Sequence, residues 1–100
     1  MRLRFTPLAL IELEGILHQI SAQSLQGANR VRLRIRDVLA ALADHPGLGA
    51  RTDDANLRRL VVRPYPYLIF YEARDGEVVI VGIRHAARDP GSMPGAGEGT

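Results

Sequence analysis

The sequence has neither cysteine nor lysine among its 100 residues. Without cysteine the chain has no disulfide framework, no thiolate nucleophile and no cysteine-based metal site, and we expect a reducing, cytoplasmic location. Without lysine it has no P-loop and no mechanism that needs a lysine base. All 13 basic residues are therefore arginine, whose rigid fork of donors suits phosphate and carboxylate groups.

Other familiar sites are also missing. There is no G-x-S-x-G nucleophile elbow, and the three histidines, His18, His45 and His85, lack the spacing of metal ligands. No stretch is long and apolar enough to span a membrane, and Glu12 and Glu14 interrupt the only run that resembles a signal peptide. We therefore expect no metal, no cofactor and no membrane contact, but a surface that grips a larger partner.

The first third of the chain predicts a strand followed by a helical hairpin. Residues 1–6 alternate apolar and polar side chains, as a short strand does. Thr6 and Pro7 form a helix start, and the helix is predicted to run to about Ser24, with Gly27 in the turn. Its expected buried stripe is Leu10, Leu13, Leu17 and Ile20. A second helix is predicted from Ala28 to His45, with a buried stripe of Val31, Ile35, Val38, Leu39 and Leu42.

The rest of the chain changes to strand periodicity. Leu57–Arg63, Tyr67–Ala73 and Val78–Ile83 are predicted strands, and Asp75-Gly76 is a tight-turn signal between the last two. The expected fold is α+β in the order β-α-α-β-β-β, with the helical hairpin packed on a small antiparallel sheet. We assign residues 1–90 to a single domain and residues 91–100 to a glycine-rich disordered tail.

Three groups of arginines are the candidate functional residues. Arg30, Arg32, Arg34 and Arg36 lie around the polar side of the second helix, as a solvated face or as a basic binding surface. Arg51, Arg58, Arg59 and Arg63 flank the first strand of the second half. Arg84, His85 and Arg88 follow where the last strand ends. On strand periodicity Arg59 and Arg63 share one face while Arg58 lies on the other.

Each group has a structural alternative. Arg58 could form an ion pair with Asp53 or Asp54 in the preceding loop, which would contribute little if exposed. His85 could act as a general acid or phosphate contact, or it could cap the core through one hydrogen bond.

Joint spacing links this chain to a known family. Gly49-Ala50-Arg51, Arg58-Arg59-Leu60, Tyr67-Leu68-Ile69-Phe70-Tyr71 and the closing Ile83-Arg84-His85-Ala86-Ala87-Arg88-Asp89 resemble the RelE/ParE superfamily of bacterial type II toxin–antitoxin toxins. The resemblance covers about residues 2–90 and includes the predicted element order. It implies a cognate antitoxin of the ParD kind, whose C-terminal segment wraps the toxin in a hetero-oligomer.

The resemblance leans toward the ParE branch, because RelE-like ribonucleases usually need several lysines. A ParE-like toxin would have no catalytic residue and would inhibit DNA gyrase, and thereby replication, by protein–protein binding. Its target-binding residues would be Arg30, Arg32, Arg36, Arg51, Arg59, Arg84, His85 and Arg88. The alternative is a RelE-like, ribosome-dependent mRNA endoribonuclease, with His85 as acid and Arg51, Arg58 and Arg88 as phosphate clamps.

Overall fold

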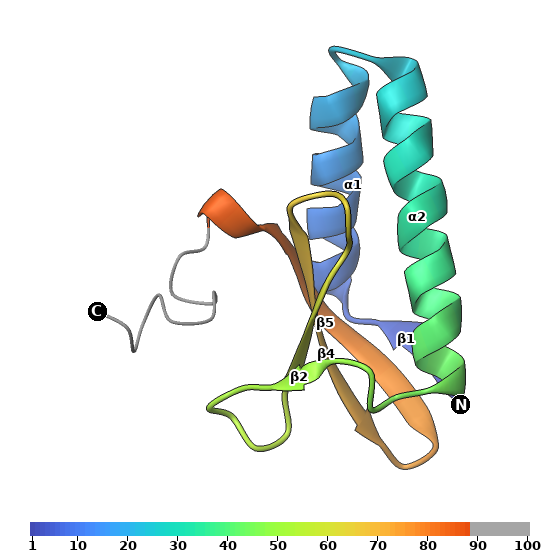
Figure 1. The fold of residues 1–100 in the computed structure, drawn as a ribbon, viewed down its shortest axis with the longest axis vertical. Coiled ribbons are helices and arrows are strands. Elements are labelled where there is room, and N and C mark those ends of the chain that lie inside the picture. Colours follow the sequence, from blue (N-terminus) through green and yellow to red (C-terminus); the bar gives the residue numbers. More distant parts are fainter. Residues whose placement is uncertain (89–100) are drawn as a thin grey trace.

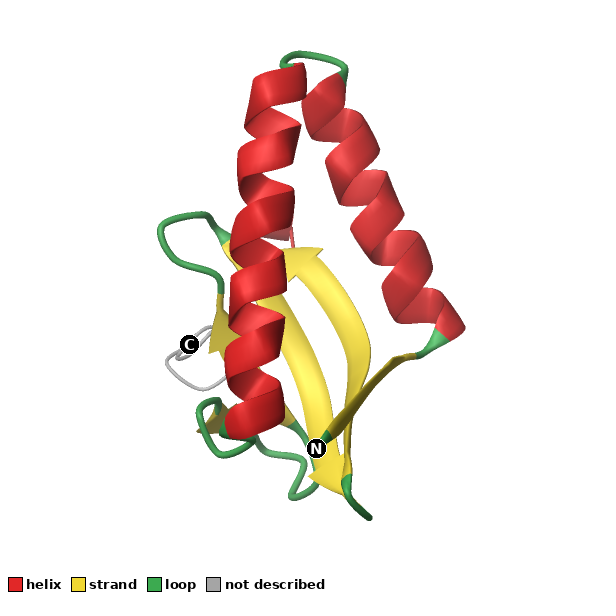
Figure 2. Cartoon of the chain, turned by 90° about the vertical axis from the view of Figure 1, so that its right-hand side faces the viewer, coloured by secondary structure: helices red, strands yellow, loops and turns green. Residues whose placement is uncertain are grey.

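Two helices form a hairpin that covers one face of a five-stranded sheet in the computed structural model, which describes residues 1–88 (Figure 1). The closed end of the hairpin projects well beyond the end of the sheet in both views (Figure 2). The elements are β1 (Arg2–Phe5), α1 (Pro7–Ser21), α2 (Leu25–Asp44), β2 (Ala50–Arg51), β3 (Arg58–Val61), β4 (Tyr67–Arg74), β5 (Glu77–His85) and the 3₁₀ turn η1 (Ala86–Arg88). The predicted α+β class and the predicted order of long elements are confirmed.

Side-chain caps set the start of each helix. Thr6 caps α1 by accepting a hydrogen bond from the Ala9 amide at 3.1 Å, as predicted. Ser24 caps α2 in the same way, accepting from the Gly27 amide at 2.9 Å. The prediction that Ser24 ends the first helix is therefore wrong. Gly27 lies in the first turn of α2 and not between the helices.

The sheet has the order β1-β5-β4-β3-β2 and is mixed. β5, β4, β3 and β2 pair antiparallel, but β1 pairs parallel to β5. The antiparallel sheet that the sequence predicts thus holds for the meander and fails for the N-terminal strand. The tight turn at Asp75 and Gly76 is confirmed, because both residues have positive φ, as a type I′ hairpin requires.

The core lies between the hairpin and the facing side of the sheet. It contains the predicted stripe of α2 together with Ile69, Tyr71, Val78, Ile80 and Ile83. The predicted stripe of α1 is wrong at one position, since Leu10 is 46% exposed. Ala9 is fully buried instead, and Leu13, Ile16, Leu17 and Ile20 pack against the core.

Glu12 covers the part of the β5 edge that β1 leaves unpaired. β1 pairs with β5 only as far as Ile80, which leaves the edge of β5 open beyond that residue. There the Glu12 carboxylate accepts from the Ile83 amide at 3.1 Å and from Arg84 Nε at 3.3 Å. An edge strand with unpaired amides is a template for wrong pairing, and α1 covers this one.

The predicted tail, residues 91–100, lies outside the described residues. Within residues 1–88 no helix combines the length and the apolar character needed to cross a bilayer.

Candidate functional site

The arginines of α2 are exposed but do not form one patch. Arg30, Arg32 and Arg36 all lie on the solvent side of the helix. Arg32 and Arg36 are one helical turn apart, whereas Arg30 projects from the other flank of the same face. Exposed Leu33 lies between the two flanks. The helix therefore presents a broad face of mixed basic and apolar character, suited to contact with another macromolecule.

Arg34 has a different role from its neighbours. Its Nε donates to the Arg63 carbonyl at 2.6 Å, so that it ties α2 to the loop between β3 and β4. Arg34 therefore has a structural contact in the fold.

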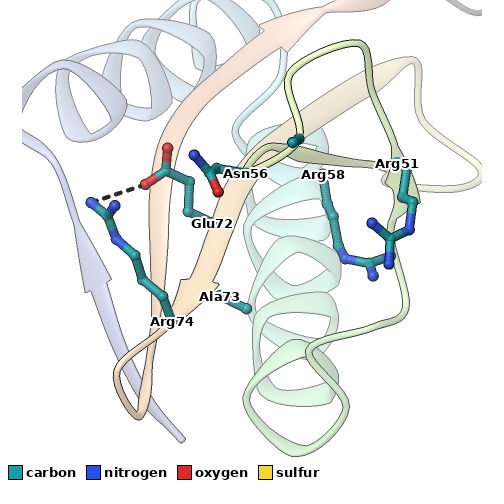
Figure 3. Close-up of a pocket in the computed structure, with 7 residues that line it drawn as sticks. Arg51, Asn56, Arg58, Glu72, Ala73 and Arg74 are labelled. Carbon is teal, nitrogen blue, oxygen red and sulfur yellow. Dashed lines mark ion pairs between the residues drawn. The ribbon is translucent and has the colours of Figure 1, made fainter.

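Arg51 and Arg58 lie directly opposite each other on β2 and β3, and we call them the Arg51–Arg58 pair. The two-residue strand β2 that positions Arg51 is absent from the prediction. Both side chains line a hollow of about 170 Å³ beside the end of β4 (Figure 3). Arg58 Nη1 donates to the Gly49 carbonyl at 2.7 Å. The sequence therefore placed both arginines among the candidates without showing that they meet.

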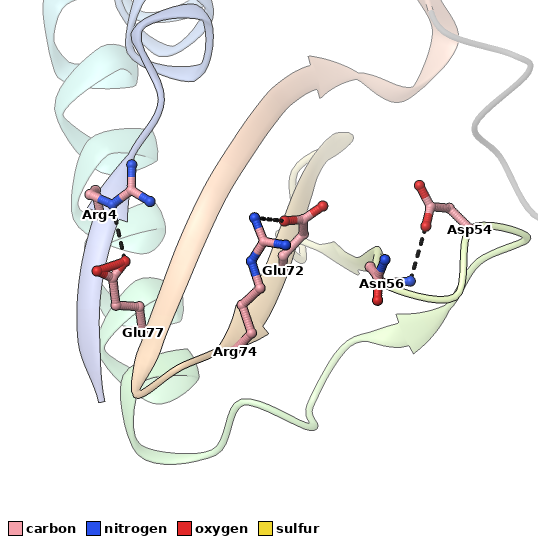
Figure 4. Close-up of polar contacts among 6 residues, drawn as sticks. All are labelled: Arg4, Asp54, Asn56, Glu72, Arg74 and Glu77. Carbon is pink, nitrogen blue, oxygen red and sulfur yellow. Dashed lines mark hydrogen bonds and ion pairs between the residues drawn. The ribbon is translucent and has the colours of Figure 1, made fainter.

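The predicted ion pair of Arg58 with Asp53 or Asp54 does not form. Asp54 Oδ1 instead accepts from the Asn56 amide at 3.0 Å, inside its own loop (Figure 4). Asp53 is exposed. Asp54 therefore stabilises its own loop and Asp53 faces solvent. Arg58 donates to the Gly49 carbonyl instead.

A buried tyrosine holds the segment that carries this pair. Tyr71 is fully buried, and its hydroxyl accepts from the Gly49 amide at 2.7 Å and donates to the Pro46 carbonyl at 2.8 Å. Burial raises the pKa of the Tyr71 phenol, against smaller lowering effects of the Gly49 hydrogen bond and the Arg58 charge. We call Tyr71, Gly49 and Pro46 the tyrosine clamp. Sequence reasoning missed it, although a buried tyrosine signals that its hydroxyl needs a partner.

Arg59 and Arg84 lie on the sheet face that turns away from the hairpin. Arg59 is half-buried and pairs across the strands with Phe70. Arg84 lies over the Phe70 ring, at 5.4 Å from its centroid, and forms an ion pair with Glu12. Arg84 was predicted as a target contact, and its contacts give it a structural role as well.

His85 ends β5 against Tyr67. The two rings meet edge to face with centroids 5.4 Å apart, and His85 Nδ1 accepts from the Ala87 amide at 3.1 Å. This bond starts the turn η1, where Arg88 lies. In the neutral ring the proton is therefore on Nε2, which is the nitrogen left for an outside partner.

The structure separates His85 from the Arg51–Arg58 pair. His85 lies opposite Tyr67 on β4, whereas Arg58 lies opposite Tyr71 on the other side of the same strand. Four residues of strand span about 13 Å. The register therefore sets the backbone positions of His85 and Arg58 apart, and within residues 1–88 no hydrogen bond or ring contact joins His85 to Arg51 or Arg58. The side chain of Arg88, the remaining member of the ribonuclease alternative, lies outside the described part of the chain. Among residues 1–88 no group of three or more histidine, aspartate or glutamate side chains could hold a metal ion.

A protein family matches most of the chain. Residues 3–90 match the family described as the ParE toxin of the type II toxin–antitoxin system, parDE. The chain is 46% identical over 80 residues to Toxin RelE2 of Caulobacter vibrioides, covering 80% of this chain and 89% of that protein. It is 35% identical over 85 residues to the putative toxin Y4kP of Sinorhizobium fredii, covering 84% and 88% respectively.

Solved structures share the fold at low sequence identity. A chain of the chromosomal ParDE toxin–antitoxin system from P. aeruginosa superposes with a TM-score of 0.72 at 20% identity, covering 85% of this chain and 95% of that one. A conserved hypothetical protein from Helicobacter pylori superposes with a TM-score of 0.57 at 14% identity, covering 87% and 96%. These likenesses support the two-layer architecture.

Proposed function

The chain belongs to the ParE/RelE family of toxins of bacterial type II toxin–antitoxin systems, and we propose that it is a ParE-like inhibitor of DNA gyrase. Such a toxin arrests growth in the cytoplasm by binding its target protein and catalyses nothing. A cognate ParD-like antitoxin neutralises it in a hetero-oligomer.

The separation of the polar candidates is the observation that carries this proposal. Phosphodiester cleavage needs a base, an acid and charge stabilisation within hydrogen-bond reach of one phosphate. Here His85 and Arg58 lie opposite Tyr67 and Tyr71, about 13 Å apart along β4. A surface of dispersed arginines suits a protein interface, where each charge needs its own partner and none needs to converge.

The proposed target surface consists of the exposed face of α2, with Arg30, Arg32 and Arg36, and the segment His85–Arg88. Leu33 adds an apolar contact in the middle of the helical face, because it is 41% exposed. Arginine beside an exposed apolar side chain is typical of the residues that dominate protein interfaces.

The antitoxin would cover a different part of the hairpin. Leu8 and Ile11 of α1 are 54% and 65% exposed and lie one helical turn apart. An amphipathic helix of the antitoxin laid along them would bury this apolar surface.

A RelE-like mRNA endoribonuclease is the second candidate, and the state of His85 favours it. Its Nδ1 is occupied by the Ala87 amide, so the neutral ring carries its proton on Nε2. That N–H can donate a hydrogen bond to a phosphate oxygen, whereas proton transfer to a leaving oxygen would require the imidazolium form.

Controlled expression in bacteria distinguishes the two functions. Pulse-labelled DNA and protein synthesis are followed separately for the wild type, for His85→Ala and for the triple variant Arg30→Gln/Arg32→Gln/Arg36→Gln. A gyrase inhibitor should stop DNA synthesis first, lose its toxicity in the triple variant and keep most of it in His85→Ala, which removes only one contact of a broad surface. If protein synthesis stops first, with cleaved mRNA and a harmless His85→Ala, the ribonuclease hypothesis is right.

A further inference from the structure

The Arg51–Arg58 pair brings two like charges together across a strand pair. β2 and β3 pair antiparallel in the register that sets the two residues opposite each other. Like charges in that position destabilise a sheet. Among residues 1–88 the ion pairs are made by Arg4, Arg74 and Arg84, so neither member of this pair has a carboxylate partner. A bound anion would remove the repulsion.

The site is held in place before any ligand arrives. Arg58 Nη1 is fixed by the Gly49 carbonyl at 2.7 Å, and the Gly49 amide is fixed by Tyr71 at 2.7 Å. Nε and Nη2 of Arg58 remain as donors, and Arg51 is exposed beside them. Donors that are already held in place lose little conformational entropy when a ligand binds, so the pair can bind an anion more tightly than two mobile surface arginines would.

The charge of the hollow matches a phosphate group. Its lining contains Arg51, Arg58, Arg74 and Glu72. Arg74 and Glu72 pair with each other at 3.2 Å, and Figure 3 shows them pointing away from the other two arginines. Three arginines and one glutamate leave two positive charges, both on the Arg51–Arg58 pair. A phosphate monoester carries about one and a half to two negative charges at neutral pH.

We propose that the Arg51–Arg58 pair binds one phosphate group, supplied either by a polynucleotide backbone or by a small phosphorylated molecule. A single planar carboxylate is satisfied by one guanidinium fork, whereas a tetrahedral phosphate has oxygens for two forks from two strands. The hollow of about 170 Å³ has room for the phosphate and part of the group that bears it. Asn56, also in the lining, adds a neutral amide donor. The inference rests on the geometry of the pair, and it extends the phosphate role that the ribonuclease alternative gives to Arg51 and Arg58 to phosphate groups bound without cleavage.

Titration of the purified chain followed by ¹⁵N NMR tests this site. The probes are inorganic phosphate, a nucleoside monophosphate and a short single-stranded oligonucleotide. We expect saturable shifts at the amides of Arg51, Asn56 and Arg58. Arg51→Gln should weaken phosphate binding by about tenfold or more, the usual effect of losing a charge-assisted hydrogen bond. Arg2→Gln is the matched control, because it removes the same charge from an exposed side chain on β1, at the opposite edge of the sheet.

Arg51 is the decisive position, since it is exposed and its loss should not disturb the fold. Tighter binding of the oligonucleotide than of inorganic phosphate would identify a polynucleotide as the source, and tighter binding of the nucleoside monophosphate would identify a small molecule. Absence of shifts at these amides with all three probes would overturn the proposal. Equal binding by Arg51→Gln and wild type would also overturn it.

Discussion

Removal of the Tyr71 hydroxyl, a single oxygen atom, should destabilise the protein strongly because two backbone groups lose their hydrogen-bond partner. In Tyr71→Phe the ring still fills the core, but the Gly49 amide loses its acceptor and the Pro46 carbonyl loses its donor. Gly49 is buried, so its amide carries the full cost of an unpaired donor, about 1–3 kcal/mol. Pro46 is only half-buried, and water can partly replace the lost donor. We therefore expect a loss of about 2–3 kcal/mol.

Thermal and urea unfolding of the purified chain measure this loss. For a domain of this size, each kcal/mol corresponds to roughly 4–8 °C in melting temperature, so a decrease of roughly 10–20 °C is expected. Tyr67→Phe is the matched control, because its hydroxyl makes no hydrogen bond within residues 1–88 and only its ring contacts His85. Equal melting temperatures for the two variants would refute the assignment of the tyrosine clamp as a stabilising element.

Three further predictions concern the stability of the fold. Stability should be retained below about pH 10 and fall as the pH rises beyond it, because burial raises the pKa of Tyr71 and the phenolate is disfavoured in the fold; unfolding at pH 8 and above pH 10 checks this. Gly49→Ala should cost about 1–3 kcal/mol in urea unfolding, since its Cβ would approach the Tyr71 ring and hydroxyl to 2.7 Å. Glu12→Ala should cost about 1–3 kcal/mol by leaving the Ile83 amide unpaired, whereas Glu14→Ala, on the exposed side of α1, should cost little.

Features that depend only on neighbouring residues in the sequence, such as a helical stripe, a cap or a tight turn, could be predicted. The buried stripe of α2 is correct at all five predicted positions, because helical periodicity alone decides which side chains share a face. The Thr6 cap and the Asp75-Gly76 turn are correct because side-chain chemistry and positive φ specify them directly. At Gly27 the same kind of reasoning failed. Glycine is enriched just after helices, and here it lies just inside one, where the Ser24 cap holds its amide.

Contacts between distant segments could not be predicted in this way. β2 has only two residues and exists because Ala50 and Arg51 pair with β3. Its pairing creates the Arg51–Arg58 pair, so the candidate phosphate site depends on a register that sequence periodicity does not contain. The spacing between His85 and Arg58 depends on register in the same way. Both lie near the ends of their own strands, but the register of β3, β4 and β5 sets His85 opposite Tyr67 and Arg58 opposite Tyr71, four residues further along β4.

Glu12 shows how one such contact changes the meaning of a residue. In the sequence it is a charge that interrupts an apolar run. In the structure β1 is too short to pair with β5 beyond Ile80. The Glu12 carboxylate accepts from the Ile83 amide, which no residue of β1 reaches. The same carboxylate holds Arg84 over Phe70, so this arginine is committed to the fold. We therefore expect target contacts from arginines that have no carboxylate partner among residues 1–88, such as Arg30, Arg32 and Arg36 on α2.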